Sequence, residues 1–548
     1  MRERKRFILA MLVILIIIVC YPMIQQGIMC NDELMLRLWS QQGMTSFFKT
    51  TIINENISNG RILGVIGNLK FISYISDNKY IFRTIGVLVL LSALGLFGYI
   101  IYRMSKKIVF SFGITIIALI FIPITFELSV PNAYMIVCLQ PLILLELSII
   151  SWIDYLKKKK KRNVIMCCCF FLWAMFLYEF IITYIFLFPC LVLIKKENMD
   201  RQSFVEAIKK TVPIVITAII YVIMYIVQGK IFPTHYLGNV LEIPSLEILL
   251  NVLKRLFASA LPGYFVLFSD KYKFLFQYYN KGKFSIDNIL NPTILCFAIA
   301  LLLILIMLFF KNQKTHVERQ KNKFISIGII ILSFVYGFLP ALPNALSPLY
   351  QSAVTNGEFI SVPVSIYLYL ANVFTISFAL YEIGKRFQNI YLRIVLCGGI
   401  LIGASAVQIE NQVFSTEQSS NFERIEDIEN MLRMDYWKQF GNITIDAPSL
   451  YETKNTLAVE ELHWTKYAQI YGNYLTVNSS SEQECNMYIE MQKDNSFYLY
   501  WDDNNVLITK YQLNDEVVSL KTVDSQYKQF SDWKEMGKDG KYFIYLLR

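Results

Sequence analysis

The sequence predicts a polytopic α-helical membrane protein of about 11 transmembrane helices, followed by a C-terminal extracytoplasmic α+β domain. Hydrophobic residues make up 55% of the 548 residues and aromatic residues 15%, which is too apolar for a water-soluble globule of this length. The apolar residues fall in runs of about 20, the length that crosses a bilayer as a helix. Lys and Arg cluster between these runs, and the residues after Gln408 are acidic overall.

The first apolar run, residues 7–23, follows a basic N-terminus. A charged start before an apolar core is also typical of a secretory signal peptide. No small-residue cleavage site follows this run, and Met29 before Cys30 argues against lipoprotein processing. We therefore predict an uncleaved anchor whose N-terminus lies in the cytosol.

The basic runs at 157–162 and 195–210 decide the path of the chain between them. Both are expected on the cytosolic side, so residues 164–194 must leave the cytosol and return, turning near Tyr178 and Glu179. The other predicted spans are 81–102, 108–124, 133–152, 212–227, 289–310, 324–339, 359–380 and 391–408.

Residues 246–268 are apolar enough to be mistaken for another span. If they crossed, the basic stretch 311–323 would lie outside, so we expect an interfacial helix there. The transmembrane domain then covers residues 1–408, with outside loops at 30–79 and 228–288, and the extracytoplasmic domain covers 409–548. The predicted location is the plasma membrane.

Charge divides along the same boundary. After Gln408 there are 13 basic and 23 acidic residues, which leaves 39 basic against 19 acidic residues for the membrane portion. The net charge of +10 therefore reflects topology and not nucleic-acid binding. Cys30 and Cys485 are the only cysteines expected outside, too few for a disulfide framework, and no Cys or His spacing resembles a zinc site.

The tail has a helical pattern over 421–440 and then short alternating runs at 442–445, 497–500 and 542–546. These patterns predict a small α+β domain. Its tryptophans suit either a carbohydrate-binding face or the domain's core, and the core is the commoner use. They are Trp437, Trp464, Trp501 and Trp533.

The first outside loop carries the most informative residues. Asp32 and Glu33 follow the first span, and acids at that depth are rare unless something uses them. Residues 34–39 and 47–53 have the spacing of short interfacial helices, and Arg61 comes later in the loop. A sugar hydroxyl needs a base to take its proton, and a polyprenyl phosphate leaves more easily beside a cation. The loop therefore holds the parts that lipid-linked sugar transfer requires.

The layout of nearly the whole chain resembles the GT-C glycosyltransferases, multi-spanning enzymes that use polyprenyl-phosphate sugars at the outer membrane face. The resemblance rests on Asp32-Glu33 after the first span, Asn59-Gly60-Arg61, the Tyr178-Glu179 turn and the outside tail. These features look like those of the bacterial members that add sugars to surface polysaccharides. The resemblance implies that Asp32 is the catalytic base, with Glu33 as the adjacent candidate, and that the acceptor is an extracytoplasmic glycan or glycolipid.

Each candidate also has a structural interpretation. Acids favour helix N-termini, basic side chains snorkel from interfacial helices, and a lone His is more often structural. The chain has no Asp-x-Asp, so no metal ligand is assigned and metal dependence stays open. The remaining candidates are Arg61, Lys254, Arg255 and His235 for the donor phosphate, and Glu179 and Glu127 for acceptor binding or support.

The expected reaction is inverting transfer of one sugar, in which Asp32 deprotonates the acceptor hydroxyl and Arg61 holds the phosphate. The closest alternative is a polysaccharide polymerase or ligase, in which Arg61 and Arg255 matter more than Asp32. A flippase or transporter is a further alternative, but it favours charged spans and repeated halves, and the spans here look nearly free of charge. A scaffold with a binding tail would tolerate every carboxylate change.

Overall fold

The computed structural model describes most of the chain up to residue 433 and, beyond it, one helix and eight strands. The described residues are 2–28, 31–124, 130–194, 200–233, 240–262, 285–309, 333, 336, 337, 339–355, 365–386, 390–433, 443–446, 461–472, 475–478, 487–491, 497–500, 509–513, 516–519, 533–539 and 542–547. They form two compact units. The first comprises Met1–Gln26 and Thr45–Thr416, and the second comprises Gly27–Met44 and Glu417–Arg548.

The regular secondary structure of the first unit is all helical in the residues that the structure describes. Its longer helices are α1 (Arg2–Gln25), α5 (Lys79–Ser105), α6 (Ile108–Ile120), α7 (Met135–Lys158), α8 (Lys161–Leu177), α10 (Arg201–Ile231), α11 (Leu246–Ser259), α15 (Pro292–Phe309), α18 (Ser365–Arg386) and α19 (Ile390–Leu432), the last of which continues into the second unit. The shorter ones are α3 (Met44–Phe47), α4 (Glu55–Ser58), α9 (Leu187–Leu193), α14 (Ile286–Ile289), α17 (Pro348–Thr355), the π-helix η1 (Phe48–Asn54) and the 3₁₀ helices η2 (Ile62–Val65), η3 (Leu69–Asp77) and η4 (Glu179–Phe186).

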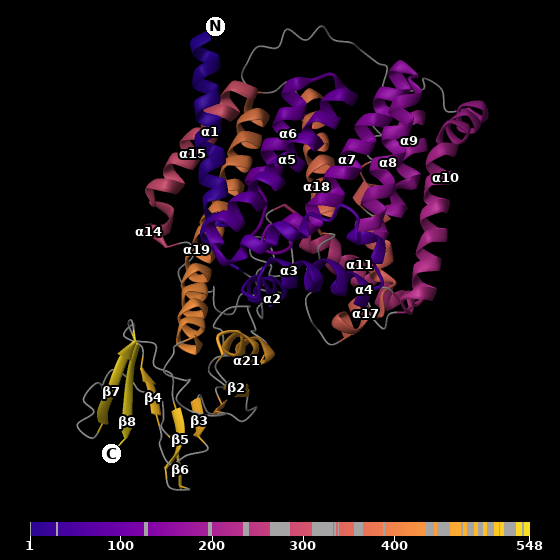
Figure 1. Cartoon of the computed structure of the whole chain (residues 1–548). Helices are drawn as coiled ribbons and strands as arrows, with labels where there is room; N and C mark the ends of the chain where they lie inside the picture. The colour runs from indigo at the N-terminus through magenta and orange to yellow at the C-terminus, as the bar shows by residue number, and fades with distance from the viewer. Residues whose placement is uncertain are drawn as a thin grey trace. The chain divides into compact units, whose positions relative to one another are not determined.

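Four of the described helices are long and apolar enough to cross a membrane: α5, α7, α10 and residues 390–416 of α19. Shorter apolar helices cover residues 9–25, 108–120, 179–193 and 292–306. Helices α5, α6, α7, α8 and α10 lie side by side in Figure 1. This architecture is that of a helical membrane protein, and the count of eleven crossings stays a prediction.

The reversal expected near Tyr178 is confirmed. Helix α8 ends at Leu177, Tyr178 is extended with φ −149° and ψ 119°, and η4 begins at Glu179. The N-terminus and the basic connections between α5 and α6 and between α7 and α8 lie at one end of the helices, at the top in Figure 1. Such segregation of Lys and Arg is what the positive-inside rule requires.

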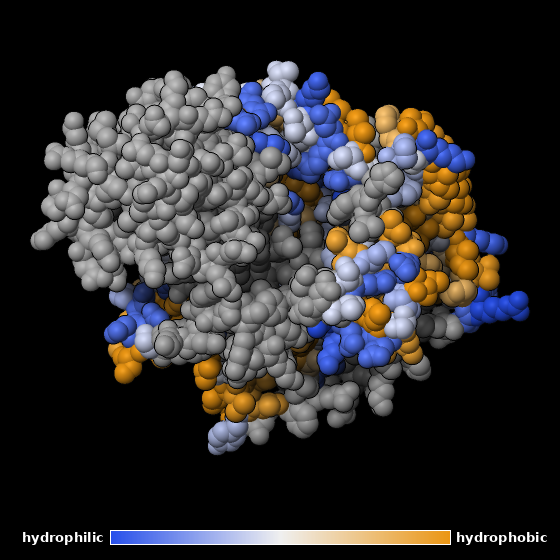
Figure 2. Space-filling model, turned by 90° about the horizontal axis from the view of Figure 1, so that it is seen from below, coloured by the Kyte–Doolittle hydropathy of each residue, from blue (hydrophilic) through white to orange (hydrophobic). Residues whose placement is uncertain are grey.

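The outer face of α10 exposes apolar side chains. Ile219, Ile223 and Ile226 are each more than half exposed. Residues of high hydropathy gather on the right flank of the molecule in Figure 2, the side on which α10 lies in Figure 1. An apolar surface this extensive is unfavourable in water, so it suits contact with lipid.

The core between α7, α8 and α9 is built from aromatic side chains. Trp152 of α7 is fully buried, and its Nε1 donates to the carbonyl oxygen of Phe188 at 3.3 Å. The ring of Phe188 makes edge contacts with Trp152 at 5.8 Å and with Phe171 at 5.2 Å between centroids. These contacts fix the position of the chain that returns after Tyr178.

The second unit combines α2 (Asn31–Ser40), the end of α19 and α21 (Glu461–Ile470) with two sheets. One sheet has the strand order β2-β1-β3-β5-β6, with β1 parallel to β2 and β3 parallel to β5, and the other is the antiparallel sheet β4-β8-β7. The strands are β1 (Ile443–Asp446), β2 (Leu475–Asn478), β3 (Met487–Met491), β4 (Phe497–Tyr500), β5 (Thr509–Leu513), β6 (Glu516–Ser519), β7 (Trp533–Asp539) and β8 (Tyr542–Leu547). The α+β class of the whole tail stays a prediction, because the described residues cover only part of it.

Residues 27–44 belong to the second unit, a grouping that the sequence does not predict. One of the contacts within this unit is an ion pair between Arg37 of α2 and two acids of α19. The Nη2 atom of Arg37 lies 3.2 Å from Glu426 Oε1 and 3.0 Å from Glu429 Oε2. Its guanidinium also lies over the Phe422 ring, 5.0 Å from the centroid.

Candidate functional site

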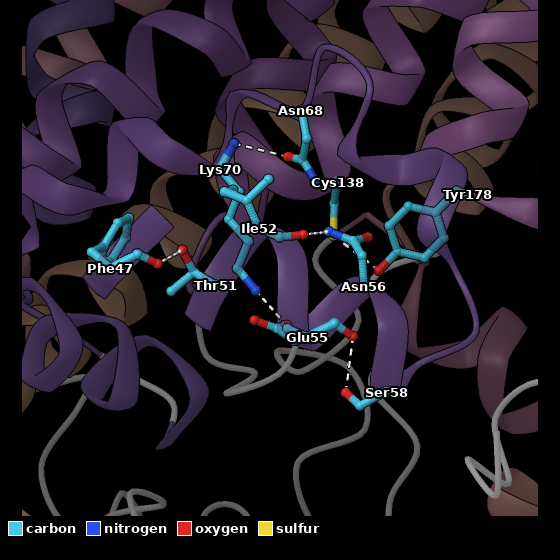
Figure 3. Close-up of polar contacts among 10 residues, drawn as sticks. All are labelled: Phe47, Thr51, Ile52, Glu55, Asn56, Ser58, Asn68, Lys70, Cys138 and Tyr178. Atoms are coloured by element: carbon cyan, nitrogen blue, oxygen red, sulfur yellow. Dashed lines mark hydrogen bonds and ion pairs between the residues drawn. The ribbon is translucent and has the colours of Figure 1, made fainter. Parts of the chain in front are cut away.

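The loop between residues 44 and 78 is a series of short helices that includes the π-helix η1. Side chains bond back to the backbone here: Thr51 Oγ1 donates to the carbonyl of Phe47, and Asn56 Nδ2 donates to the carbonyl of Ile52, each at 2.6 Å (Figure 3). Such bonds compete with regular helix formation. π-Helices are rare and occur frequently at functional sites, so this loop is the first place to look for chemistry.

An ion pair joins α4 to η3 within the same loop. Lys70 Nζ binds Glu55 Oε1, and Ser58 Oγ donates to the carbonyl of Glu55 at 3.0 Å (Figure 3). The backbone N–H of Lys70 donates to Asn68 Oδ1 at 2.8 Å. These contacts hold the two short helices together and make Lys70 a structural residue.

The turn that carries Arg61 is fixed from two sides. The Arg61 N–H donates to the carbonyl of Asn56 at 2.6 Å, and Gly60 adopts a φ of +67°, which glycine tolerates without steric cost. Gln228 of α10 donates from Nε2 to the carbonyl of Gly60 at 2.8 Å and accepts from the N–H of Leu63 at 3.3 Å. The end of α10 therefore sets the position of Arg61.

The structure brings together two predicted site residues, Arg61 and Glu179. Arg61 Nε donates to Glu179 Oε1 at 2.6 Å, and the two side chains are 21% and 25% exposed. The guanidinium also lies over the ring of Tyr178, 5.0 Å from its centroid, which is a cation–π contact. Tyr221 and Tyr225 of α10 are within electrostatic reach of both charges.

This pair has a definite chemical capacity. A guanidinium matches phosphate geometry through several N–H donors, and the partial exposure of Arg61 leaves some of these donors accessible. The adjacent carboxylate cancels the positive charge of Arg61 before any ligand arrives. A phosphate must therefore share Arg61 with Glu179, and this competition moderates phosphate affinity.

Asp32 and Glu33 lie in the first turn of α2, in the second unit. Asp32 is exposed, whereas Glu33 is only 2% exposed. Of the two acids, Asp32 is thus the one that a substrate in solution reaches. The first turn is also where a carboxylate interacts favourably with the helix dipole, so the capping interpretation fits this position as well.

Lys254 and Arg255 lie on α11, with Lys254 exposed and Arg255 partly buried. One face of α11 is inserted into the first unit through the fully buried side chains of Val252 and Leu256, while Leu246 is exposed. That amphipathic pattern suits an interfacial helix, which stays a prediction. Glu127 and His235 lie outside the described residues.

The helices that the sequence predicts to be nearly free of charge do bury a few ionisable side chains. Arg83 of α5 and Glu146 of α7 are completely buried, and Glu410 of α19 is 4% exposed. The guanidinium of Arg83 donates to the carbonyl oxygens of Pro131, at 3.3 Å, and Asn132. These charges stand in the sequence inside apolar runs, and ionisable residues in such runs are rare enough to have signalled buried sites.

Within the described part of the chain, no cluster of three or more His, Cys, Asp or Glu side chains could hold a metal ion. Comparison with known proteins gives no further guidance to the site. No protein-family model, curated protein or solved structure matches this chain.

Proposed function

We propose that this chain is a membrane glycosyltransferase that transfers a sugar from a polyprenyl-phosphate donor to an extracytoplasmic glycan or glycolipid, with inversion. The supporting observation is the Arg61–Glu179 pair, held against Tyr178 at the reversal of the chain and beside the loop of short helices. The proposed topology has eleven crossings in the plasma membrane, a cytosolic N-terminus and an outside α+β tail.

In this proposal Arg61 binds the donor phosphate. Negative charge grows on the phosphate oxygen as its bond to the anomeric carbon breaks, and a positioned guanidinium stabilises that charge. Glu179 orients Arg61 before the donor binds, and its ion pair with Arg61 weakens as negative charge develops on the phosphate. The ring of Tyr178 holds the guanidinium through its cation–π contact.

The acceptor hydroxyl needs a base, and Asp32 is the proposed one. Its carboxylate takes the hydroxyl proton, the oxygen attacks the anomeric carbon in line, and polyprenyl phosphate leaves with the electron pair of the broken bond. The choice of Asp32 over Glu33 agrees with their exposures, and its role rests on the resemblance in sequence.

A binding comparison tests phosphate recognition. Purified protein is titrated with a long-chain polyprenyl phosphate and with the matching polyprenol, which lacks the phosphate. We expect the ratio of the affinity for polyprenyl phosphate to the affinity for polyprenol to be about tenfold smaller in R61A than in the wild type, or smaller still. A tenfold change is equivalent to about 1.4 kcal/mol. K70M is the matched control, because it breaks a Lys–Glu pair in the same loop. An equal preference in R61A and wild type would contradict the proposal.

A transfer assay tests the reaction. Vesicles are supplied with polyprenyl-phosphate-linked radiolabelled hexoses, and release of polyprenyl phosphate is measured with and without cell-wall glycan acceptors. D32N should abolish release while membrane insertion and lipid binding persist. If R61A abolishes transfer of whole glycan chains and D32N retains it, the polymerase or ligase alternative is the better one.

The buried charges favour transport as a second candidate function. Arg83 and Glu146 are completely buried within helices that could cross a membrane, and charges in such positions often mark transport pathways. Reconstituted vesicles that move a labelled polyprenyl-linked glycan between leaflets, without any sugar transfer, would support this candidate over the enzyme.

A further inference from the structure

Glu146 is a buried acid that the proposed sugar transfer does not use. It lies midway along α7 and is completely inaccessible to solvent. Neither carboxylate oxygen has a hydrogen-bond partner among the residues that the structure describes. A buried carboxylate in this condition is strongly unfavourable unless something else neutralises it.

Three tyrosines from other segments interact electrostatically with this carboxylate. They are Tyr184 of η4, Tyr336, which precedes α17 in the chain, and Tyr367 of α18. Each of the three is nearly or completely buried. The Tyr184 ring contacts those of Tyr336 and Tyr367, at centroid distances of 5.2 and 6.1 Å. Four separate segments thus place oxygen atoms in one region of the helical core.

The hydroxyl hydrogens of two tyrosines are already committed. Tyr184 donates to the carbonyl of Tyr336 at 2.7 Å, and Tyr367 lies 3.4 Å from the carbonyl of Cys138, to which it donates. Each of these hydroxyls therefore presents lone pairs to any further partner. The hydroxyl of Tyr336 has no hydrogen-bond partner within the described residues.

The orphaned atoms indicate what kind of partner fits. A proton on Glu146 would cover one oxygen, and the resulting O–H would itself need an acceptor. A monovalent metal cation is contacted by several oxygens at once, from carboxylates, hydroxyls and carbonyls, and it cancels a single negative charge. A divalent cation would leave a net positive charge in the low-dielectric interior, which is again unfavourable.

We propose that Glu146, with the hydroxyls of Tyr184, Tyr336 and Tyr367, binds a monovalent metal cation, Na⁺ or K⁺, inside the helical core. The site does not depend on the proposed sugar transfer. It joins α7, η4 and α18, so its occupancy holds these segments together.

Thermal unfolding of the purified full-length protein tests the site. Melting temperatures are compared in NaCl, KCl and choline chloride at equal ionic strength, because choline is too large to replace a metal ion. We expect the wild type to melt several degrees higher in NaCl or KCl than in choline chloride, since a ligand that binds only the folded state raises stability. The salt that gives the larger rise identifies the preferred ion.

Two variants and a control separate this site from general salt effects. E146Q should show the same melting temperature in all three salts, and in choline chloride it should equal or exceed the wild type. Y336F should need a several-fold higher cation concentration for half of the full rise. E247Q removes an exposed carboxylate on α11 and should behave like the wild type.

A wild type with one melting temperature in all three salts would overturn the proposal. So would a cation response that persists in E146Q, or a stability that follows pH and ignores the identity of the cation, because Glu146 would then carry a proton. If E146Q does not fold, an unchanged half-saturating concentration in Y336F overturns the site.

Discussion

Replacing Arg37 by methionine should lower the stability of the second unit of this protein. Arg37 is 7% exposed and binds Glu429, which is only 1% exposed, while Glu426 is 31% exposed. Without Arg37, the buried carboxylate of Glu429 loses this cation, and removal of one partner of a buried ion pair costs about 3–5 kcal/mol. The pairing with Glu426 adds at most about 1 kcal/mol, because that side chain is more exposed to solvent. We therefore expect R37M to destabilise the second unit by about 3–5 kcal/mol.

Pulse proteolysis of the full-length protein across a urea series measures this loss. For a unit of about 150 residues, with a denaturant dependence of about 2 kcal/mol/M, the midpoint should fall by roughly 1.5–2.5 M. E426Q is the control and should shift the midpoint little. The double variant R37M/E429L should recover most of the loss, because apolar replacement of a buried pair is often neutral.

Two results would refute this reasoning. A fall of less than about 0.5 M in R37M, below 1 kcal/mol at the same denaturant dependence, would mean that the ion pair contributes no more than a surface pair. A double variant as unstable as R37M would mean that Arg37 acts through packing and not through the charge of Glu429.

Three further variants test other contacts. E179Q should bind polyprenyl phosphate several-fold more tightly than wild type in the titration described above, because Arg61 keeps its full charge; unchanged or weaker binding would argue against the proposed competition. R83M should lower stability by about 2–5 kcal/mol, since two buried carbonyls lose their donor, and unfolding in detergent at a near-wild-type temperature would contradict this. Burial, and to a smaller extent the nearby acid Glu429, raise the pKa of Tyr467 well above its usual value. The neutral phenol therefore contributes its full stability below the unfolded pKa of about 10, and this contribution is lost at higher pH. Y467F should accordingly reduce the loss of stability at alkaline pH that pulse proteolysis measures.

Local patterns are sufficient to predict the helices and to identify Arg61 and Glu179 as separate candidates, but not to predict the contact between them. The position of the reversal follows from two basic runs that must lie on the same side, and Tyr178 indeed breaks the helix there. The sequence predicts both Arg61 and Glu179 to be outward charges, yet their separation of 118 residues gives no indication that they touch. The contact depends on Gln228 and on the turn at Gly60, neither of which forms a recognisable motif.

The sequence does not predict the grouping of α2 with the tail, for a similar reason. Arg37 and Glu426 are 389 residues apart, and each looks like an ordinary surface charge in its own helix. The buried charges were overlooked for the opposite reason. Glu146 was visible inside an apolar run, but average hydropathy over a window hides a single acid among leucines and isoleucines.

Two separate parts of the chain form the second unit, residues 27–44 and the residues after 416. A truncated product that starts after residue 416 would carry Glu429 without the arginine that neutralises it. In a relative that has the tail without the early segment, we therefore expect a smaller or apolar residue at the position of Glu429.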